Sequence, residues 1–170
     1  MFIKESDKFI TTVIITTVKM MNQGEQHWQL FATISGIYIK SRRIAEEQLK
    51  PLKVTWPQFG ALFNLNQEDN ITQTQLAERM EADVNTTMVL CNSLERKGWI
   101  TRNRDPSDKR VNLLSITTEG RAIFQIALPL ILQDYTVFTE AISTENIQLI
   151  MPILRDLYSK VNERYLEVKK

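Results

Sequence analysis

The hydrophobic pattern of this chain changes its period once, and that change restricts the fold more than any other feature. From Gln26 to Lys97 apolar residues recur every three or four positions, as they do in amphipathic helices. The stretches "WITRNR" (99–104) and "RVNLLSI" (110–116) instead alternate with a period of two, which predicts two short strands paired as a hairpin. Helical periodicity then returns. The sequence therefore predicts a mostly α fold with one small β-hairpin.

Capping residues and helix breakers divide the helical region that precedes the hairpin. The expected helices are Gln26–Leu49, Thr55–Leu65, Thr72–Met80 and Asn85–Lys97. Pro51 ends the first, and Thr55 caps the second with a proline in its first turn. Thr72 and Gln75 form a capping box, and Gly98 is the C-terminal glycine of the fourth helix. Residues 1–22 are rich in β-branched side chains, and we assign them to an additional helix.

Two further helices are expected after the hairpin. Thr117 or Thr118 caps a helix that continues to about Ile142 and is kinked at Pro129. Ser143 starts the last helix, whose apolar face comprises Ile147, Ile150, Met151, Leu154, Leu157, Tyr158, Val161 and Tyr165. A terminal helix should not leave such a face in water, and the first helix has a similar stripe. The outer helices are therefore predicted to form a homodimer.

Composition excludes several classes of protein. The 170 residues carry a net charge of +1, with one cysteine (Cys91) and one histidine (His27), so an intrachain disulfide and a typical zinc site are both excluded. Cys91 falls on an inward stripe and is interpreted as a core residue. The longest apolar stretches are shorter than the roughly 20 residues that cross a bilayer. The sequence contains no phosphate loop and no catalytic set. We expect a soluble, cytoplasmic protein that is not an enzyme and has no cofactor.

The middle of the chain has the layout of a winged helix-turn-helix, in which two short helices precede a two-stranded hairpin. In such a domain the second helix enters the major groove of DNA, and the hairpin, or wing, reaches the backbone or the minor groove. The hairpin carries four basic and two acidic residues: Arg102, Arg104, Lys109, Arg110, Asp105 and Asp108. Positive charge is therefore concentrated on the wing, where phosphate contacts are expected.

Four short motifs lie in the part of the chain from Thr55 to Gly120. They are Leu76-Ala77-Glu78, Leu94-Glu95-Arg96-Lys97-Gly98, Asp108-Lys109-Arg110 and Ile116-Thr117-Thr118-Glu119-Gly120. Together they resemble the signature of the MarR family of bacterial winged helix-turn-helix transcriptional regulators. The resemblance implies N-terminal dimerisation helices at 1–54, a DNA-binding domain at 55–120 and C-terminal dimerisation helices at 121–170.

The resemblance also implies that Arg110 reaches the minor groove and that Asp108 orients it. The predicted DNA-contacting residues are Thr72, Gln73, Asn85, Thr86, Met88, Val89, Asn92, Arg102, Arg104, Lys109 and Arg110. Members of the family often carry a basic residue in the place of Val89, whereas no Lys or Arg precedes Arg96 on this recognition helix. Asparagine pairing with adenine, together with apolar contacts to thymine methyl groups, would then favour an operator rich in A·T pairs.

Family resemblance further implies an effector site between the dimer helices and the DNA-binding lobe, and small aromatic acids are common ligands there. The candidate pocket residues are His27, Trp28, Phe31, Trp56 and Phe63, and the expected effector is a small aromatic or apolar acid. The predicted function is that of a sequence-specific double-stranded DNA-binding regulator, a repressor acting as a homodimer on a pseudo-palindromic operator. The alternative is a winged helix used only for protein–protein contacts, to which Lys109 and Arg110 would contribute little.

Overall fold

The computed structural model describes residues 5–168, and the side chains of residues 24–133 and 135–168. The chain divides into two compact units, residues 1–46 and 47–170. The first unit is formed by helix α1 (Glu5–Leu49), whose last turn belongs to the second unit. Residues 5–22 are helical as expected, but they continue directly into the next segment. The expectation of two separate helices was therefore wrong: α1 is one continuous helix, and no proline that would end a helix precedes Pro51.

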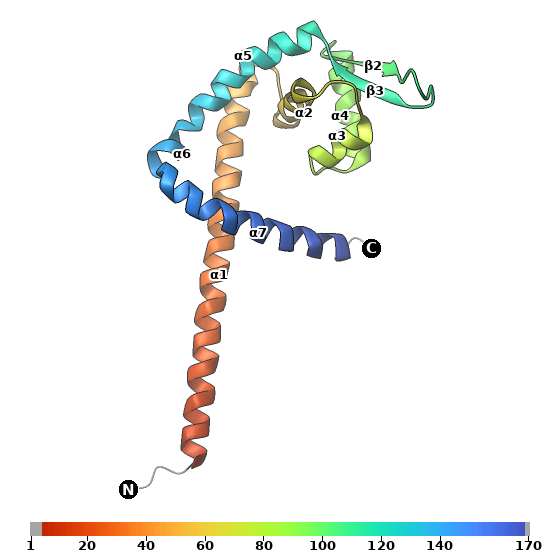
Figure 1. Ribbon diagram of the computed structural model, residues 1–170. Coiled ribbons are helices and arrows are strands. Elements are labelled where there is room, and N and C mark those ends of the chain that lie inside the picture. Colours follow the sequence, from red (N-terminus) through yellow and green to blue (C-terminus); the bar gives the residue numbers. More distant parts are fainter. Residues whose placement is uncertain (1–4, 169–170) are drawn as a thin grey trace. The chain divides into compact units, whose positions relative to one another are not determined.

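After the last turn of α1, the second unit continues with a short 3₁₀ helix, η1 (Lys50–Leu52), and then with three helices that form a lobe with the sheet (Figure 1). These are α2 (Trp56–Gln67), α3 (Gln73–Arg79) and α4 (Val84–Arg96). The predicted capping box of Thr72 with Gln75 is present, and the predicted cap Thr55 forms a second box with Gln58. Asp83, which the sequence analysis did not identify, caps α4 by accepting two backbone hydrogen bonds at 2.8 and 3.0 Å. Local capping chemistry therefore sets the starts of α2, α3 and α4.

The predicted hairpin is formed by β2 (Ile100–Arg104) and β3 (Asn112–Ile116), which pair antiparallel (Figure 1). A third strand, β1 (Ile71–Thr72), pairs with the other edge of β3, so that the sheet order is β1-β3-β2. Sequence analysis missed β1, because two residues are too few for a periodic pattern. This short strand ties the start of α3 to the base of the wing.

The core of the lobe lies between the three helices and the inner face of the sheet. Its fully buried side chains include Leu62, Leu65, Ile71, Leu76, Cys91, Leu94 and Leu114. Gly120 lies at the edge of this core, where a Cβ atom would approach the carbonyl oxygen of Trp99 to 2.0 Å. The backbone N–H of Thr117 donates to that same oxygen at 3.0 Å. The glycine of the Ile-Thr-x-x-Gly motif is therefore required for close packing of two backbone segments.

Three helices follow the sheet: α5 (Thr118–Asp134), α6 (Thr136–Ala141) and α7 (Thr144–Val168). Thr117 caps α5 and Ser143 accepts a bond at the start of α7, as expected. The single helix expected through Ile142 is instead interrupted at Tyr135, six residues after Pro129. There the Tyr135 N–H donates to the Leu132 carbonyl, and the Thr136 hydroxyl donates to the Gln133 carbonyl. These short-range bonds replace the regular helical ladder.

By length and mean hydropathy (1.3), the segment Thr118–Ala141 is the one part of the described residues that could span a membrane. Phe124, Ala127 and Ile131 of this segment are buried within the protein, and Phe124 packs on Phe59 with ring centroids 5.7 Å apart. Part of its apolar surface is thus buried by packing against α2. The apolar face of α7, in contrast, has no buried residue.

Candidate nucleic-acid interface

Helix α4 presents two chemically distinct faces. Thr87, Cys91 and Leu94 are buried. The predicted contact residues on this helix are all exposed: Asn85, Thr86, Met88, Val89 and Asn92. Val89 is 64% exposed, although it is an aliphatic residue at the centre of the helix. The exposed stripe therefore offers two amides, a hydroxyl and two apolar side chains, a combination suited to base edges and thymine methyl groups.

The two predicted contacts at the start of α3 are engaged within the protein. Thr72 is half-buried, and its hydroxyl accepts the N–H of Gln75 at 3.2 Å. Gln73 is also half-buried, and its amide nitrogen donates to the Val84 carbonyl at 3.4 Å. This contact joins the first turn of α3 to the first turn of α4. Both residues therefore have structural roles in the helix-turn-helix in addition to their predicted contact with DNA.

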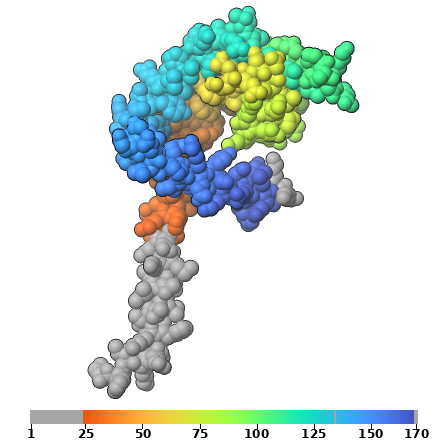
Figure 2. Space-filling view, viewed as in Figure 1, coloured from red at the N-terminus to blue at the C-terminus, as the bar shows by residue number. Residues whose placement is uncertain are grey.

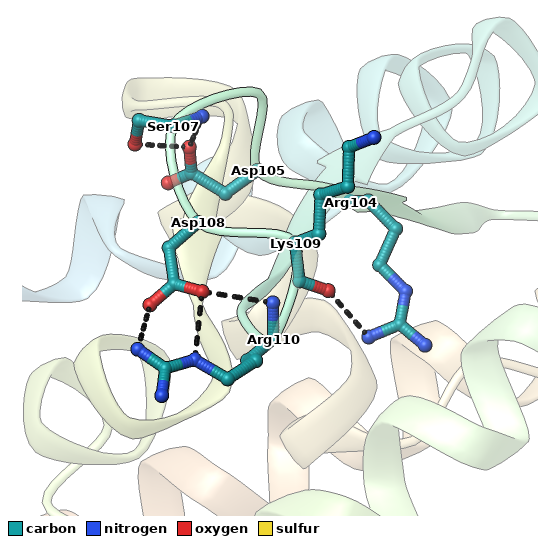
Figure 3. Close-up of polar contacts among 6 residues, drawn as sticks. All are labelled: Arg104, Asp105, Ser107, Asp108, Lys109 and Arg110. Carbon is teal, nitrogen blue, oxygen red and sulfur yellow. Dashed lines mark hydrogen bonds and ion pairs between the residues drawn. The ribbon is translucent and has the colours of Figure 1, made fainter.

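The wing carries a bidentate ion pair at its tip (Figure 3). Nε and Nη2 of Arg110 donate to Oδ1 and Oδ2 of Asp108, both at 3.0 Å, and the Arg110 backbone N–H also donates to Oδ1 at 3.0 Å. These bonds hold the pKa of the Asp108 carboxyl below its usual value and raise the pKa of Arg110. The Arg110 side chain remains 91% exposed. The structure therefore brings together the two residues that were predicted to act as a pair.

Further bonds fix the turn from which Arg110 projects. Asp105 accepts the backbone N–H and the hydroxyl of Ser107 at 2.7 and 2.6 Å, and these bonds lower the pKa of its carboxyl (Figure 3). Arg104 donates to the Lys109 carbonyl at 2.9 Å, at the loop that connects the two strands of the hairpin. The hairpin projects from the lobe in the space-filling view (Figure 2). The wing tip is thus an ordered, charged projection.

Arg102 and Arg110 are both ion-paired within the protein, but Arg102 is far less exposed than Arg110. Its guanidinium forms an ion pair with Glu95 of α4, and its side chain is only 22% exposed. A second nitrogen of the same guanidinium donates to Oδ1 of Asn92 at 2.8 Å. The net charge predicted for the wing therefore overestimates its attraction for phosphates, which depends on Arg104, Lys109 and Arg110.

Sequence analysis did not identify a polar cluster at the far end of α4. The ammonium group of Lys97 donates to the Lys53 carbonyl at 2.6 Å and to Oε1 of Gln58 at 2.9 Å, and it lies 4.2 Å from the centroid of the Trp99 ring. Burial lowers the pKa of Lys97. The amide of Gln58 in turn donates to Ser93 at 3.1 Å. This cluster anchors the C-terminal end of α4 to the start of α2, which fixes the direction of the recognition helix.

The lone cysteine lies in the core. Cys91 is fully buried, as predicted, and desolvation raises the pKa of its thiol. Within the described side chains, no group of three or more His, Cys, Asp or Glu residues could hold a metal ion.

An apolar cavity of about 320 Å³ lies between α2 and the end of α5. Its lining residues are Trp56, Phe59, Gly60, Phe63, Leu128, Ile131, Leu132 and Tyr135. Two of the five predicted pocket residues, Trp56 and Phe63, are among them. The other three, His27, Trp28 and Phe31, belong to α1 in the first unit, where the rings of Trp28 and Phe31 lie 5.5 Å apart. The aliphatic lining from α5 was not predicted, because that helix follows its partner by more than 60 residues.

Comparison with known proteins extends the similarity beyond the motifs. Residues 54–111 match the model of the MarR family. The multiple antibiotic resistance protein MarR of Escherichia coli is 34% identical over 95 residues, which cover 56% of this chain and just under two thirds (66%) of that protein. The organic hydroperoxide resistance transcriptional regulator of Bacillus subtilis is 31% identical over 112 residues, covering 64% of this chain and 76% of that regulator.

Solved structures show the same similarity in three dimensions. A mutant of E. coli MarR complexed with operator DNA superposes with a TM-score of 0.69 at 26% identity, covering 75% of this chain and 92% of that one. The apo form of wild-type E. coli MarR gives a TM-score of 0.64 at 28% identity. The transcriptional regulator SlyA, at 23% identity, shares the fold with a TM-score of 0.75.

Proposed function

Because the chain belongs to the MarR family of transcriptional regulators, we propose that it represses transcription by binding a pseudo-palindromic operator in double-stranded DNA as a homodimer. Two observations carry the proposal: the ordered pair of Asp108 and Arg110 at the wing tip, and the exposed stripe of α4. An exposed arginine held in one orientation can enter a minor groove without first losing side-chain entropy. The family consists of transcriptional regulators rather than enzymes. The proposed site of action is the bacterial cytoplasm, where the operator is.

Dimerisation is supported by α7, a 25-residue helix with an apolar face along its whole length. Along this face Tyr158, Val161 and Tyr165 are each more than half exposed. A second copy of the chain is the proposed partner, since a two-fold dimer covers the same face of both subunits. Two recognition helices would then read half-sites about one helical turn, roughly 10 base pairs, apart.

The cavity between α2 and α5 is the proposed effector site. Its lining includes Leu132 and Tyr135, which flank the interruption between α5 and α6, so that an occupant would contact the junction that leads to α7. The aromatic or aliphatic part of a small acid fits such a lining, and its carboxylate would face solvent. A tenfold loss of DNA affinity requires about 1.4 kcal/mol of coupling between the two sites.

The experiment that tests this function is a titration of the intact protein against DNA from the region upstream of its own gene. A labelled duplex is followed by fluorescence anisotropy at physiological salt, with a shuffled duplex of equal length as the control. We expect the native fragment to bind at least about 10³-fold more tightly than the shuffled one. Equal and weak binding to both duplexes would instead support the protein-interaction alternative. The effector is tested by adding benzoate or salicylate, for which release of DNA is the expected result.

A further inference from the structure

Arg102 fixes the orientation of one amide on the recognition helix. Oδ1 of Asn92 accepts a hydrogen bond from Nη2 of Arg102 at 2.8 Å. A guanidinium has only donors, so the amide atom that faces it must be the oxygen and not the nitrogen. Arg102 is itself held in place, because it is paired with Glu95 one turn further along α4 and its side chain is mostly buried. Strand β2 therefore dictates which end of the Asn92 amide faces outward.

The amide nitrogen of Asn92 remains available. It donates no hydrogen bond to any of the side chains or backbone groups that the structure describes, and the residue is exposed. Asn92 lies seven residues after Asn85 and three after Val89, so all three share one face of α4. This is the face proposed to enter the major groove. Asn92 would therefore meet a base edge with its N–H groups and not with its oxygen.

We infer that Asn92 reads its base pair as a donor only, and that its preferred base is guanine. Guanine presents two neighbouring acceptors, N7 and O6, in the major groove, which suit an NH₂ group. Adenine presents one acceptor and one donor, and the usual bidentate pairing of asparagine with adenine needs both the oxygen and the nitrogen of the amide. Because the Asn92 oxygen already accepts a hydrogen bond from Arg102, the amide would present an N–H donor to the N6 donor of adenine, and no hydrogen bond would form between them. This inference rests on the proposed function, and it narrows the expectation that Asn85 or Asn92 pairs with adenine to Asn85.

Asn85 provides an internal comparison on the same face. Its backbone N–H donates to Asp83 at 2.8 Å, but its side chain makes no hydrogen bond within the described part of the chain. Asn85 therefore keeps both its donor and its acceptor, and it can still pair with adenine. The two asparagines of one helix face are thus expected to read different bases, because only one of them contacts an arginine of the wing.

The experiment is in vitro selection of bound sequences from a random duplex library, performed with the full-length wild type and with four variants. N92A identifies the operator position that Asn92 reads, because the base preference should be lost at that position alone. N85A identifies the position that Asn85 reads in the same way. In the wild type we expect guanine at the first position and adenine at the second. R102M releases the Asn92 oxygen and should raise the adenine-to-guanine ratio at the first position by about fivefold or more. A purely structural role of Arg102 would lower affinity without changing the preferred base.

E95Q gives a second route to the same result if R102M folds poorly. It weakens the hold on Arg102 and leaves the arginine in place, so a smaller shift toward adenine is expected at the same position and nowhere else. Adenine at the Asn92 position in the wild type would overturn the inference. An unchanged base preference at this position in a folded R102M variant would also overturn it. If R102M does not fold, an unchanged preference in E95Q would overturn it instead. If the wild type selects no sequence at all, the proposed function itself fails, and that outcome is distinct from selection of the wrong base.

Discussion

Both carboxylate oxygens of Asp108 accept hydrogen bonds of 3.0 Å from the guanidinium of Arg110. The two residues are two positions apart on one turn, and the arginine side chain is 91% exposed. An exposed pair of this kind contributes little to folding stability. Its effect is on conformation, because the exposed guanidinium of Arg110 is held in a single geometry before any DNA is present. Substitutions in this pair should therefore change the affinity for DNA and leave the free energy of unfolding almost unchanged.

Replacing Arg110 with alanine should weaken operator binding by about 1–3 kcal/mol and reduce the salt dependence by about one counterion. The melting temperature should not change, because the side chain packs against no core residue. Anisotropy titrations at several salt concentrations measure both quantities. Lys109→Ala is the matched control: it removes one positive charge from the residue just before Arg110, and Lys109 is not paired with Asp108. If the two variants lost equal affinity, the wing would act only as a source of positive charge.

Asp108→Ala should also weaken operator binding, although it removes a negative charge from a surface proposed to face phosphates. The reason is that Arg110 then loses both of its side-chain acceptors and must be ordered when DNA binds. Simple electrostatics predicts the opposite sign. Operator affinity of this variant, measured at the same salt concentration as the wild type, decides between the two. Tighter binding would show that Asp108 does not orient Arg110.

Gly120→Ala should destabilise the lobe by at least about 1–3 kcal/mol. The added Cβ would meet the carbonyl oxygen of Trp99 at 2.0 Å, and that atom belongs to the backbone and cannot rotate away. Chemical denaturation measures the free energy of unfolding. Gly24→Ala is the control, since a Cβ there meets nothing within 4 Å and helix propensity should give a neutral or slightly stabilising effect. Equal stability of both variants would contradict the close approach described at Trp99.

Val161→Asp should convert the proposed dimer to a monomer at micromolar concentration. Val161 lies on the apolar face of α7, and burial of an unpaired carboxylate in a dimer interface is costly. Leu149→Asp is the control, because Leu149 is even more exposed, at 70%, but lies on the other side of the helix near Asp156. Sedimentation velocity distinguishes the species. A monomeric wild type, or loss of the dimer in both variants, would refute this interface.

Cys91 should react slowly with alkylating reagents in the native protein. Burial raises the pKa of its thiol, so less of the reactive thiolate is present at a given pH than in the unfolded chain. A raised native pKa also means that the contribution of Cys91 to stability is complete below its unfolded pKa, about 8.5, and is lost as the pH rises toward the native value. Alkylation rates with and without denaturant measure the protection. Fast reaction of the native protein would contradict burial of the thiol.

What the sequence determined by itself is the set of features that depend on neighbouring residues. Thr55, Thr72 and Thr117 start helices because each side chain bonds to a backbone N–H three residues away. The strands of the hairpin follow from alternation over a few positions, and the turn bonds between Asp108 and Arg110 span two residues. Such interactions depend only on residues that are close in the sequence. The residue types at these positions are therefore enough to predict them.

Tertiary structure decided the features that join distant segments. Strand β1 exists only because β3 lies beside it, and Lys97 reaches Gln58 across 39 residues of sequence. Arg102 was predicted to contact phosphate, but packing of β2 against α4 places it between Glu95 and Asn92, where it neutralises one and orients the other. A charged residue has the same appearance in sequence whether it faces solvent or a carboxylate. Its role depends on which atoms folding brings within hydrogen-bond distance, because the interaction energy falls steeply beyond that distance.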